Sequence, residues 1–407
     1  MATEPDSPIV DFVTGDATGL SIPAHGEAMH AAGTQFLTDA FRAFGSLSPG
    51  NSVTRIRTLA PCAGGSTGAK LFLSVDYAHD ESGLHTELFI KFSRDFTDPR
   101  RDWQRHEMEA EVRFAALSRL PGFPISVPTA YFADYHHDSG TGLLITERIA
   151  FGEGGIEPHR MKSLDHQTLD EPLPYYRQVI TALASLAAAH KAGRLAPDMD
   201  ERFPFDPAAG SADPVRFDET SLRARLAECA DFAKTCPQLM PAEVLTPEFQ
   251  TRMEQDAVRV LRHEAEIQHY LCGNPDMIAL CHWNAHIDNG WFWRDAAGVL
   301  HSGLMDWGRV GQITLGSALW GALSAAHHDI WDHHLDELLA LFVTVYHDEG
   351  GPQVAVEELE FHLALHMAMM GVSRMLPLPA FILRQLPEAV HASGPQDPMF
   401  LRVDSAR

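Results

Sequence analysis

The pattern of hydrophobic and polar residues changes near residue 150, from one typical of strands to one typical of helices. Between residues 52 and 149, apolar residues come in short runs of strand length, separated by turn-forming Gly, Ser and Asp. Beyond residue 150, apolar residues recur every three to four positions over longer segments, which is the period of a helix with one buried face. The pattern therefore predicts a β-rich unit followed by a mostly helical one.

The β-rich unit is predicted to contain five strands and one amphipathic helix. Glycine- and proline-containing segments separate these elements, and Pro121-Gly122 ends the helix. The predicted strands span residues 53–59, 70–77, 84–92, 129–135 and 142–148, and the helix spans residues 101–120. A further helix over residues 27–44, ended by Gly45 and Pro49, precedes this unit as an extension.

The second unit is predicted to be mostly α-helical, with three short β-like runs. The helices span residues 175–191, 221–235, 247–271, 335–347 and 356–375, and the β-like runs span 277–280, 290–293 and 300–305. We therefore expect an α+β chain with a helical extension over residues 1–50, a β-rich lobe over 51–149 and a helical lobe over 150–407.

The three β-like runs bracket the most informative polar motif of the chain. Residues 281–289 read CHWNAHIDN, and residues 303–308 read GLMDWG. In a kinase phosphoryl-transfer centre, His-x-Asp is followed five positions later by Asn and then, on a later strand, by Asp-x-Gly. Asn284 stands where that layout has the Asp that accepts the proton of the attacking hydroxyl. Asn289 and Asp306 supply the oxygen ligands that Mg²⁺ prefers, so the motif predicts a kinase fold with a replaced base.

Lys91 is the candidate phosphate-binding cation. It ends the apolar strand 84–92, where an unpaired ammonium is unfavourable if the strand is central to a sheet. An acid on the next helix would pair with it, and we favour Glu111, which lies beside the apolar stripe of that helix, with Glu107 as second choice. A surface lysine at a strand end is the alternative interpretation.

Two further segments could contact a nucleotide. Gly64, Gly65, Ser66 and Gly68 form a turn between two predicted strands, and their backbone N–H groups could lie over phosphates, although a plain hairpin turn explains them almost as well. Glu147 follows the apolar strand 142–148 at the expected interlobe hinge, where an adenine ring would bond to the backbone.

The motif resembles the aminoglycoside phosphotransferase and choline kinase-like superfamily. The spacing of His282, His286 and Asn289, the position of Asp306 and the segment 338–351 look like its ecdysteroid-kinase-like branch, and the resemblance covers roughly residues 50–375. It implies a bilobal protein kinase-like fold, with a small lobe of a five-stranded antiparallel sheet plus one helix. It also implies ATP and Mg²⁺ as cofactors and a small molecule with a hydroxyl group as the acceptor.

The chain departs from this family at two positions of the catalytic loop. Family members carry His-Gly-Asp where this chain has His282, Trp283 and Asn284. Trp283 adds bulk, and Asn284 removes a general base that typically contributes 10²- to 10⁴-fold. We assign His282, Asn284 and His286 to the catalytic site, with Asn284 able to orient a hydroxyl. Asp288 is the nearest other carboxylate, but it is expected to face elsewhere.

Three functions remain compatible with the motif. The first is an ATP-dependent phosphotransferase acting on a small-molecule hydroxyl, with weakened base catalysis. The second is a pseudokinase that binds a nucleotide or metabolite without efficient transfer, and the third is a transfer of AMP on the same fold. A Met- and aromatic-rich wall from the late helices would suit a bulky hydrophobic alcohol, although ordinary helix core explains the same residues.

Charge and composition restrict the partners. The formal net charge of -24 disfavours nucleic acids and anionic membrane surfaces. No apolar run approaches the roughly 20 residues that cross a bilayer, and the first residues lack the pattern of a signal peptide, so a soluble, cytoplasmic protein is expected. The five cysteines form no Cys-x-x-Cys pair and are expected to be reduced thiols. The histidine-rich segment 327–334 is interpreted as a solvated helix face, with a metal site as the alternative.

Overall fold

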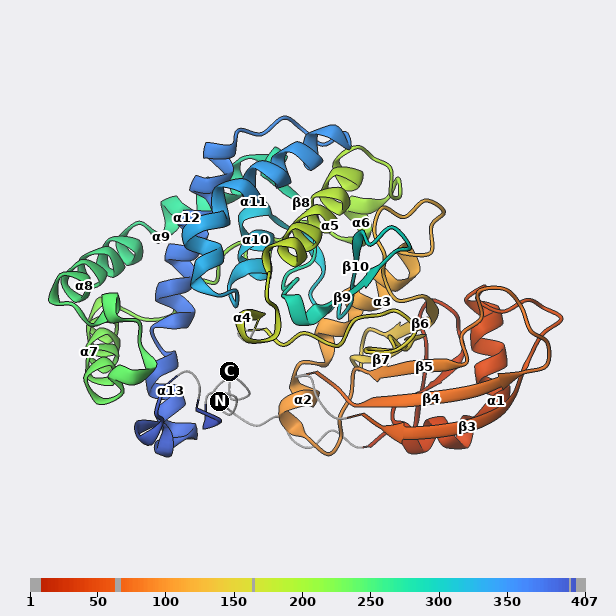
Figure 1. Ribbon diagram of the computed structural model, residues 1–407. Coiled ribbons are helices and arrows are strands. Elements are labelled where there is room, and N and C mark those ends of the chain that lie inside the picture. Colours follow the sequence, from red (N-terminus) through yellow and green to blue (C-terminus); the bar gives the residue numbers. More distant parts are fainter. Residues whose placement is uncertain (1–8, 63–66, 163–164, 395–396, 400–407) are drawn as a thin grey trace.

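A five-stranded antiparallel sheet and a mostly helical lobe make up the protein (Figure 1). The computed structural model describes residues 9–62, 67–162, 165–394 and 397–399. The sheet has the order β3-β4-β5-β7-β6. Its strands are β3 Val53–Pro61, β4 Lys70–Tyr77, β5 Glu87–Phe92, β6 Ala130–His136 and β7 Thr141–Glu147. The prediction of five antiparallel strands beside a mostly helical lobe is confirmed, and it is the architecture that the resemblance implies.

The alternation of side chains along β5 decides which face of the sheet Lys91 occupies. Leu88, Ile90 and Phe92 are fully buried in the core that the sheet forms with α1, Gly26–Ala43. Because successive side chains of a strand point to opposite faces, Lys91 lies on the other face. That face packs against α3, Met108–Leu117, and includes Leu144, the register partner of Lys91. Strand β5 thus directs the side chain of Lys91 toward helix α3.

The N-terminal extension contains a short hairpin that the sequence pattern did not predict. Strands β1, Phe12–Thr14, and β2, Ser21–Pro23, pair antiparallel before α1 begins. Three residues are too few for a period-two pattern to be recognised. The following helix α1 matches the predicted range, with a break at Gly33, whose φ is 63°.

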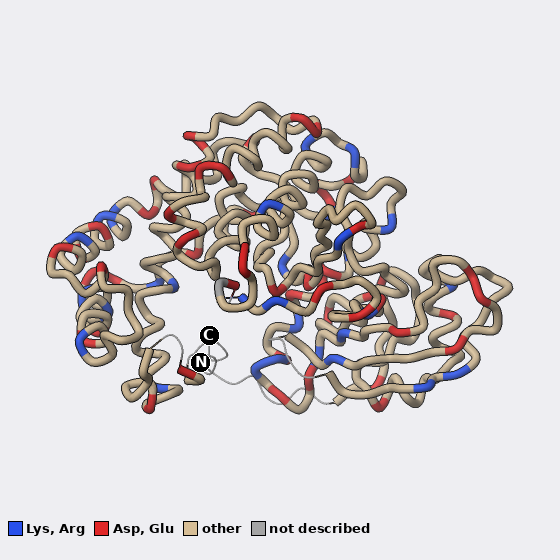
Figure 2. The backbone as a smooth tube through the Cα atoms, viewed as in Figure 1, with Lys and Arg blue, Asp and Glu red and all other residues tan. Residues whose placement is uncertain are grey.

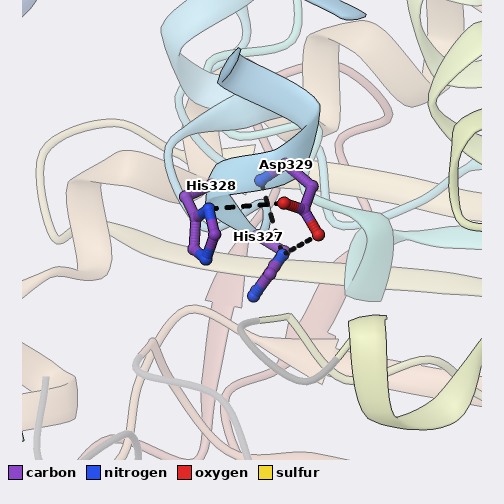
Figure 3. Close-up of side chains that lie close together, drawn as sticks. All are labelled: His327, His328 and Asp329. Atoms are coloured by element: carbon purple, nitrogen blue, oxygen red, sulfur yellow. Dashed lines mark hydrogen bonds and ion pairs between the residues drawn. The ribbon is translucent and has the colours of Figure 1, made fainter. Parts of the chain in front are cut away.

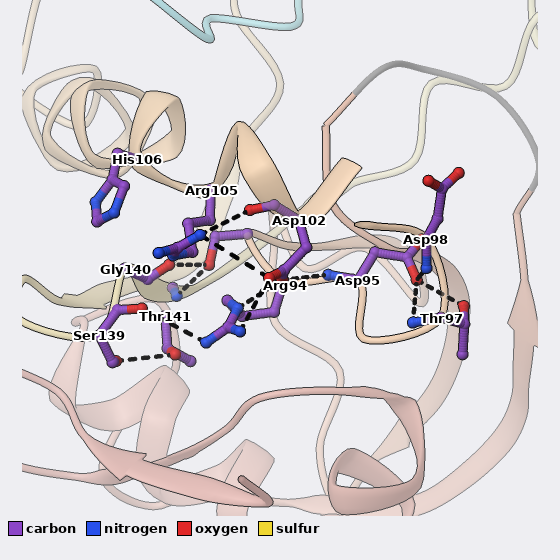
Figure 4. A network of polar contacts seen from close by, with 12 residues as sticks. Arg94, Asp95, Thr97, Asp98, Asp102, Arg105, His106, Ser139, Gly140 and Thr141 are labelled. Carbon is purple, nitrogen blue, oxygen red and sulfur yellow. Dashed lines mark hydrogen bonds and ion pairs between the residues drawn. The ribbon is translucent and has the colours of Figure 1, made fainter. Parts of the chain in front are cut away.

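The single helix predicted over residues 101–120 is three elements. They are α2 Pro99–Trp103, the 3-10 turn η1 Arg105–Glu107, and α3. Arg94, only 3% exposed, makes two hydrogen bonds to the carboxylate of Asp102, with Nε to Oδ1 at 2.6 Å and Nη2 to Oδ2 at 3.0 Å (Figure 4). This contact joins α2 to the segment that follows β5, and α3 begins after η1 as a separate helix.

The helical lobe is built around α5, Leu173–Lys191, and α10, Leu315–Leu323. The longer helices around them are α7 Glu219–Thr235, α8 Pro247–Arg262, α9 Glu264–Gly273, α11 His328–Asp348, α12 Val356–Met370 and α13 Leu378–Gln385. Shorter elements are α4 Asp165–Thr168, α6 Met199–Arg202, η2 Pro237–Leu239, η3 Ala242–Leu245, η4 Pro275–Met277, the π-helical turn η6 Gly371–Met375 and η7 Pro387–His391.

Two predictions for this lobe are corrected. The helix expected over 247–271 divides at His263 into α8 and α9. Helix α10 was not predicted, because it is apolar all around and therefore lacks the polar face that reveals an amphipathic helix.

The span Val356–Gln385 is the one described helix that is long and apolar enough, by length and composition alone, to cross a membrane. Its α12 portion packs against α9, α10 and α11 within the helical lobe.

Two small antiparallel pairs carry the motif of residues 281–308. Strand β8, Ile278–Cys281, pairs with β11, Gly311–Thr314, and β9, Gly290–Arg294, pairs with β10, Leu300–Leu304. The catalytic loop lies between β8 and the 3-10 turn η5, Ile287–Asn289. Helix α10 rests directly on this loop, because a Cβ on Gly321 would lie 1.8 Å from the carbonyl oxygen of Trp283.

Candidate active site

Lys91 joins the sheet to the helical lobe through two short ion pairs. Its Nζ lies 2.7 Å from Oε2 of Glu111 on α3 and 2.7 Å from Oδ1 of Asp306, which follows β10. Lys91 and Glu111 are 4% and 5% exposed. Glu111 rather than Glu107 is thus the partner of Lys91, as the helical spacing favoured. Residues 215 positions apart in the sequence meet at one ammonium group.

The charges of this cluster are set by burial and by each other. Lys91 holds the pKa of the Asp306 carboxyl well below its usual range. Burial opposes the charge of Lys91, but the carboxylates of Asp306 and Glu111 outweigh it and raise the pKa of the ammonium. Burial raises the pKa of Glu111, and Lys91 opposes that rise. The side chain of Asp306 is 47% exposed, so part of this carboxylate faces solvent.

Asp306 and Arg309 have unusual backbones. Their φ angles are 61° and 62°, and among the described residues they are the two that adopt positive φ without being glycine. Such conformations cost about 1 to 3 kcal/mol and persist where the surrounding structure holds them in place. Both lie within four residues of one another, so the strain is concentrated where the motif places its metal ligand.

His282 connects the catalytic loop to Asp306. The imidazole is 0% exposed, its Nε2 lies 3.0 Å from the carbonyl oxygen of Met305, and its Nδ1 accepts a hydrogen bond from the backbone N–H of Asn284 at 3.2 Å. These partners define a neutral ring with the proton on Nε2. Burial lowers the pKa of His282 to about 4. Both nitrogens are used within the protein, so His282 positions the loop.

The backbone of Asn284 is fixed while its side chain makes no hydrogen bond within the described part of the chain. Its carbonyl oxygen accepts from the N–H of His286 at 2.7 Å and from Nδ2 of Asn289 at 2.8 Å. Using Nδ2 as the donor leaves the amide oxygen of Asn289 without a hydrogen bond among the described residues. The amide of Asn284 is therefore available to a reactant and that oxygen to a cation.

His286 at the end of the loop and Asp288 in η5 are half-buried. Burial lowers the pKa of His286 to about 3, and its Nδ1 has no hydrogen-bond partner among the described residues. Burial also raises the pKa of Asp288, whose buried Oδ1 has no hydrogen-bond partner within the described ranges. The segment around His159 lies next to η5, because the Nε2 of His159 is 2.8 Å from the carbonyl oxygen of Asp288.

The glycine turn is described only at its end. Gly64, Gly65 and Ser66 lie outside the described residues. Gly68 has φ of 57°, and a Cβ there would lie 1.7 Å from the carbonyl oxygen of Phe92. A side chain cannot fit, so glycine lets the turn approach the end of β5, one residue from Lys91.

Glu147, the predicted hinge residue, is engaged by an ion pair. Its Oε2 lies 2.7 Å from Nε2 of His85. Burial would raise the pKa of Glu147, but the hydrogen bond and charge of His85 hold it below its usual range. Glu147 lines a cavity of about 560 Å³ together with Trp291 and Trp293 of β9. The cavity is not lined by Lys91 or by the catalytic-loop residues, so the structure separates Glu147 from the ion-paired cluster.

The histidine-rich segment starts helix α11 (Figure 3). His327 is the N-cap, its Nδ1 accepts from the N–H of Asp329 at 3.4 Å, and its ring lies 4.0 Å from that of His328. The Nδ1 atoms of both histidines also lie within 3.4 Å of the Asp329 carboxylate. The two rings can approach because His327 precedes the helix with non-helical backbone angles, φ -59° and ψ 148°. Helix capping explains this group, which has the ligand atoms for a metal close together.

Arg309 and Trp283 form a contact that the sequence analysis missed. The guanidinium carbon of Arg309 lies 4.2 Å from the centre of the Trp283 ring. The two residues are 26 positions apart, and no spacing rule connects them. Asp and Glu are spread over both lobes in Figure 2, and the chain has a net charge of -24. Arg309 is therefore a cation in a predominantly acidic protein.

No protein-family model and no curated protein matches the chain. Solved structures do: an aminoglycoside-3'-phosphotransferase of type VIII is 22% identical over 81% of this chain and 98% of that chain, with a TM-score of 0.37. A choline/ethanolamine kinase family protein from Mesorhizobium loti is 15% identical over 90% and 97%, with a TM-score of 0.37. A spectinomycin phosphotransferase, solved with ADP and spectinomycin, is 11% identical over 86% and 88%, with a TM-score of 0.41.

By name, these three proteins belong to the superfamily that the motif of residues 281–308 resembles. In this chain the five-stranded sheet and the helical lobe bring Lys91, Glu111 and Asp306 together in one cluster.

Proposed function

We propose that the protein is an ATP-dependent phosphotransferase that acts on a hydroxyl group of a small molecule. The observation that carries this proposal is the position of the Lys91 ammonium, 2.7 Å from both Glu111 and Asp306. A buried lysine held between an acid of the neighbouring helix and an acid of the other lobe is preorganised to bind phosphate oxygens.

The residues present fit ATP with Mg²⁺. The half-exposed carboxylate of Asp306 and the amide oxygen of Asn289 are the hard oxygen donors that Mg²⁺ takes, and the Lys91 ammonium suits phosphates. When bound, Mg²⁺ neutralises charge on the phosphates of the nucleotide. Asn289 and Asp306 would hold the cation.

In the proposed reaction, the acceptor hydroxyl oxygen forms a bond to the γ-phosphorus of ATP. The bond from that phosphorus to the β–γ bridging oxygen breaks, and ADP leaves. Asn284 orients the hydroxyl through its side-chain amide, which cannot accept the proton at neutral pH. The proton therefore passes to water, and His282 contributes by holding Asn284 in place.

The test is transfer of labelled phosphate from ATP to a panel of small hydroxylated compounds. The wild-type protein is compared with Asp306→Ala and with Asp295→Ala, which removes an exposed acid bonded to His301. The proposal predicts transfer by the wild type and by Asp295→Ala, with a loss of about a thousandfold or more in Asp306→Ala. Equal transfer by all three proteins would refute it.

Asn284 favours one second candidate, a pseudokinase that binds a nucleotide or metabolite without efficient transfer. It predicts that ATP with Mg²⁺ raises the melting temperature of the wild type while no acceptor is phosphorylated. Transfer that exceeds ATP hydrolysis in the wild type would exclude this candidate.

A further inference from the structure

Arg309 presents an uncommitted guanidinium beside the catalytic loop. The group lies over the Trp283 ring at 4.2 Å, and Trp283 directly precedes Asn284. A guanidinium has five N–H donors, and within the described residues none of those of Arg309 meets a hydrogen-bond acceptor or a carboxylate. The ring contact fixes where the charge lies without using its donors.

The backbone of Arg309 supports a role beyond packing. Its φ of 62° is a strained conformation for a residue with a side chain. Other arginines of the described chain lie over aromatic rings without positive φ, for example Arg225 over Phe217 at 4.9 Å. A cation–ring contact therefore does not require a positive φ. The two described non-glycine residues with positive φ, Asp306 and Arg309, are three positions apart.

Other charges near the loop define what Arg309 can bind. Lys162 lies on the segment that His159 attaches to the loop, and it has no ion-pair partner in the described part of the chain. Two acids lie nearby. Asp306 pairs with Lys91, and Glu107 is close enough for the charge of Arg309 to oppose the rise that burial causes in its pKa, but no ion pair joins Glu107 to Arg309 among the described residues. Arg309 over the Trp283 ring and Lys162 near His286 are thus two cations beside the loop, which favours an anionic ligand.

We propose that the acceptor carries an anionic group, a carboxylate or a phosphate, and that Arg309 binds this group beside Asn284. This inference rests on the proposed phosphotransferase function. A guanidinium matches carboxylate and phosphate oxygens with two parallel hydrogen bonds, and the Trp283 ring holds it ready for them. The anion belongs to the acceptor and not to ATP, because Arg309 lies beside the residue assigned to the acceptor hydroxyl, while Lys91 marks the nucleotide phosphates.

The test compares four acceptors with one three-carbon hydroxylated skeleton: glycerate, glycerol 3-phosphate, glycerol and 3-amino-1,2-propanediol. Transfer from ATP is measured with wild type, Arg309→Met, Arg309→Lys and the matched control Arg225→Met. We expect an anionic compound to be the best acceptor. Arg309→Met raises its KM by about tenfold to a hundredfold, the worth of a charge-assisted hydrogen bond. Arg309→Lys retains part of the effect, Arg225→Met has none, and the KM for ATP stays the same.

Three outcomes would overturn the inference. They are a preference for the amino compound, an equal rise in KM for glycerol and the anions, and a rise in the KM for ATP. The last would assign Arg309 to the transferred phosphate. Comparing glycerate with glycerol 3-phosphate tells the two anions apart.

A binding measurement separates this inference from the proposed function. Glycerate and glycerol 3-phosphate should raise the melting temperature of wild type and of Arg225→Met, but not that of Arg309→Met. If ATP neither binds nor reacts while these shifts occur, the proposed function fails and the anion site stands. If ATP with Mg²⁺ stabilises the protein and neither anion does, the anion site is refuted.

Discussion

The ion-paired cluster and the catalytic loop hold their residues by opposite means. Lys91, Glu111 and Asp306 are joined by full charges at 2.7 Å. The catalytic loop is joined by neutral contacts, in which the buried His282 and the amide of Asn289 bind backbone groups. The two regions meet at Asp306, which follows the carbonyl group that His282 contacts.

This difference bears on the proposed function. The cluster holds the charges that the proposal assigns to a nucleotide and its metal, whereas the loop has an amide where a base would carry charge. Neutral hydrogen bonds to His282 and Asn289 hold the backbone of the loop in place. An amide at residue 284 instead of a carboxylate is therefore compatible with this loop geometry.

Asn284→Asp should produce the largest change. The side chains have the same shape, and that of Asn284 makes no hydrogen bond within the described residues. Restoring a carboxylate should therefore raise kcat for the best acceptor by about 10²- to 10⁴-fold. The KM for ATP should stay constant in the same assay, because the cluster is unchanged. An unchanged kcat would mean that residue 284 does not limit the reaction.

Lys91→Met should destabilise the fold strongly. It leaves the buried carboxylate of Glu111 and that of Asp306 without their counter-charge, at a cost of about 3 to 5 kcal/mol. Urea denaturation measures the loss. The control Lys91→Met with Glu111→Leu should recover part of it, and a single variant as stable as wild type would show that the cluster contributes nothing to stability.

Gly321→Ala should disturb the catalytic loop by pushing helix α10 away from it. The new Cβ would lie 1.8 Å from the carbonyl oxygen of Trp283, so α10 must move away from the catalytic loop, at a cost of about 1 to 3 kcal/mol. Gly273→Ala is the matched control, because nothing lies within 4 Å of its Cβ. Equal stability of the two variants in urea would contradict the contact between α10 and the loop.

His366→Phe should change the pH dependence of stability. Burial lowers the pKa of His366 to about 4, and both ring nitrogens lack partners among the described residues. Below pH 6.5 the unfolded chain binds a proton here that the folded one does not, so stability falls as pH drops from 6.5 toward 4. At pH 5 this costs about 2 kcal/mol, since one unit of pKa is about 1.4 kcal/mol.

The Phe variant lacks that contribution, so its free energy of unfolding should fall less between pH 7 and pH 5 than that of wild type. The exposed His347→Phe serves as the control. A fall as large in His366→Phe as in wild type would refute the assignment.

Local patterns were sufficient to predict the five strands of the main sheet and the Lys91–Glu111 pair, but not the ion pair from Lys91 to Asp306. The apolar run before Lys91 predicted a central strand, and helical spacing predicted Glu111 as its partner. The break between α2 and α3 could not be predicted, because it depends on the tertiary contact from Arg94 to Asp102. Arg309 was missed because neither a positive φ nor a contact with a ring 26 residues earlier leaves a sequence signal.

Calorimetric binding of ATP, with and without Mg²⁺, to wild type and to Asp306→Asn tests the central claim most directly. Asp306→Asn preserves the shape of the side chain while removing the charge shared with Lys91. The account predicts that Mg²⁺ strengthens ATP binding to the wild type and that this effect of Mg²⁺ is lost in Asp306→Asn. ATP binding that does not depend on Mg²⁺ in the wild type, or an equal effect of Mg²⁺ in both proteins, would contradict it.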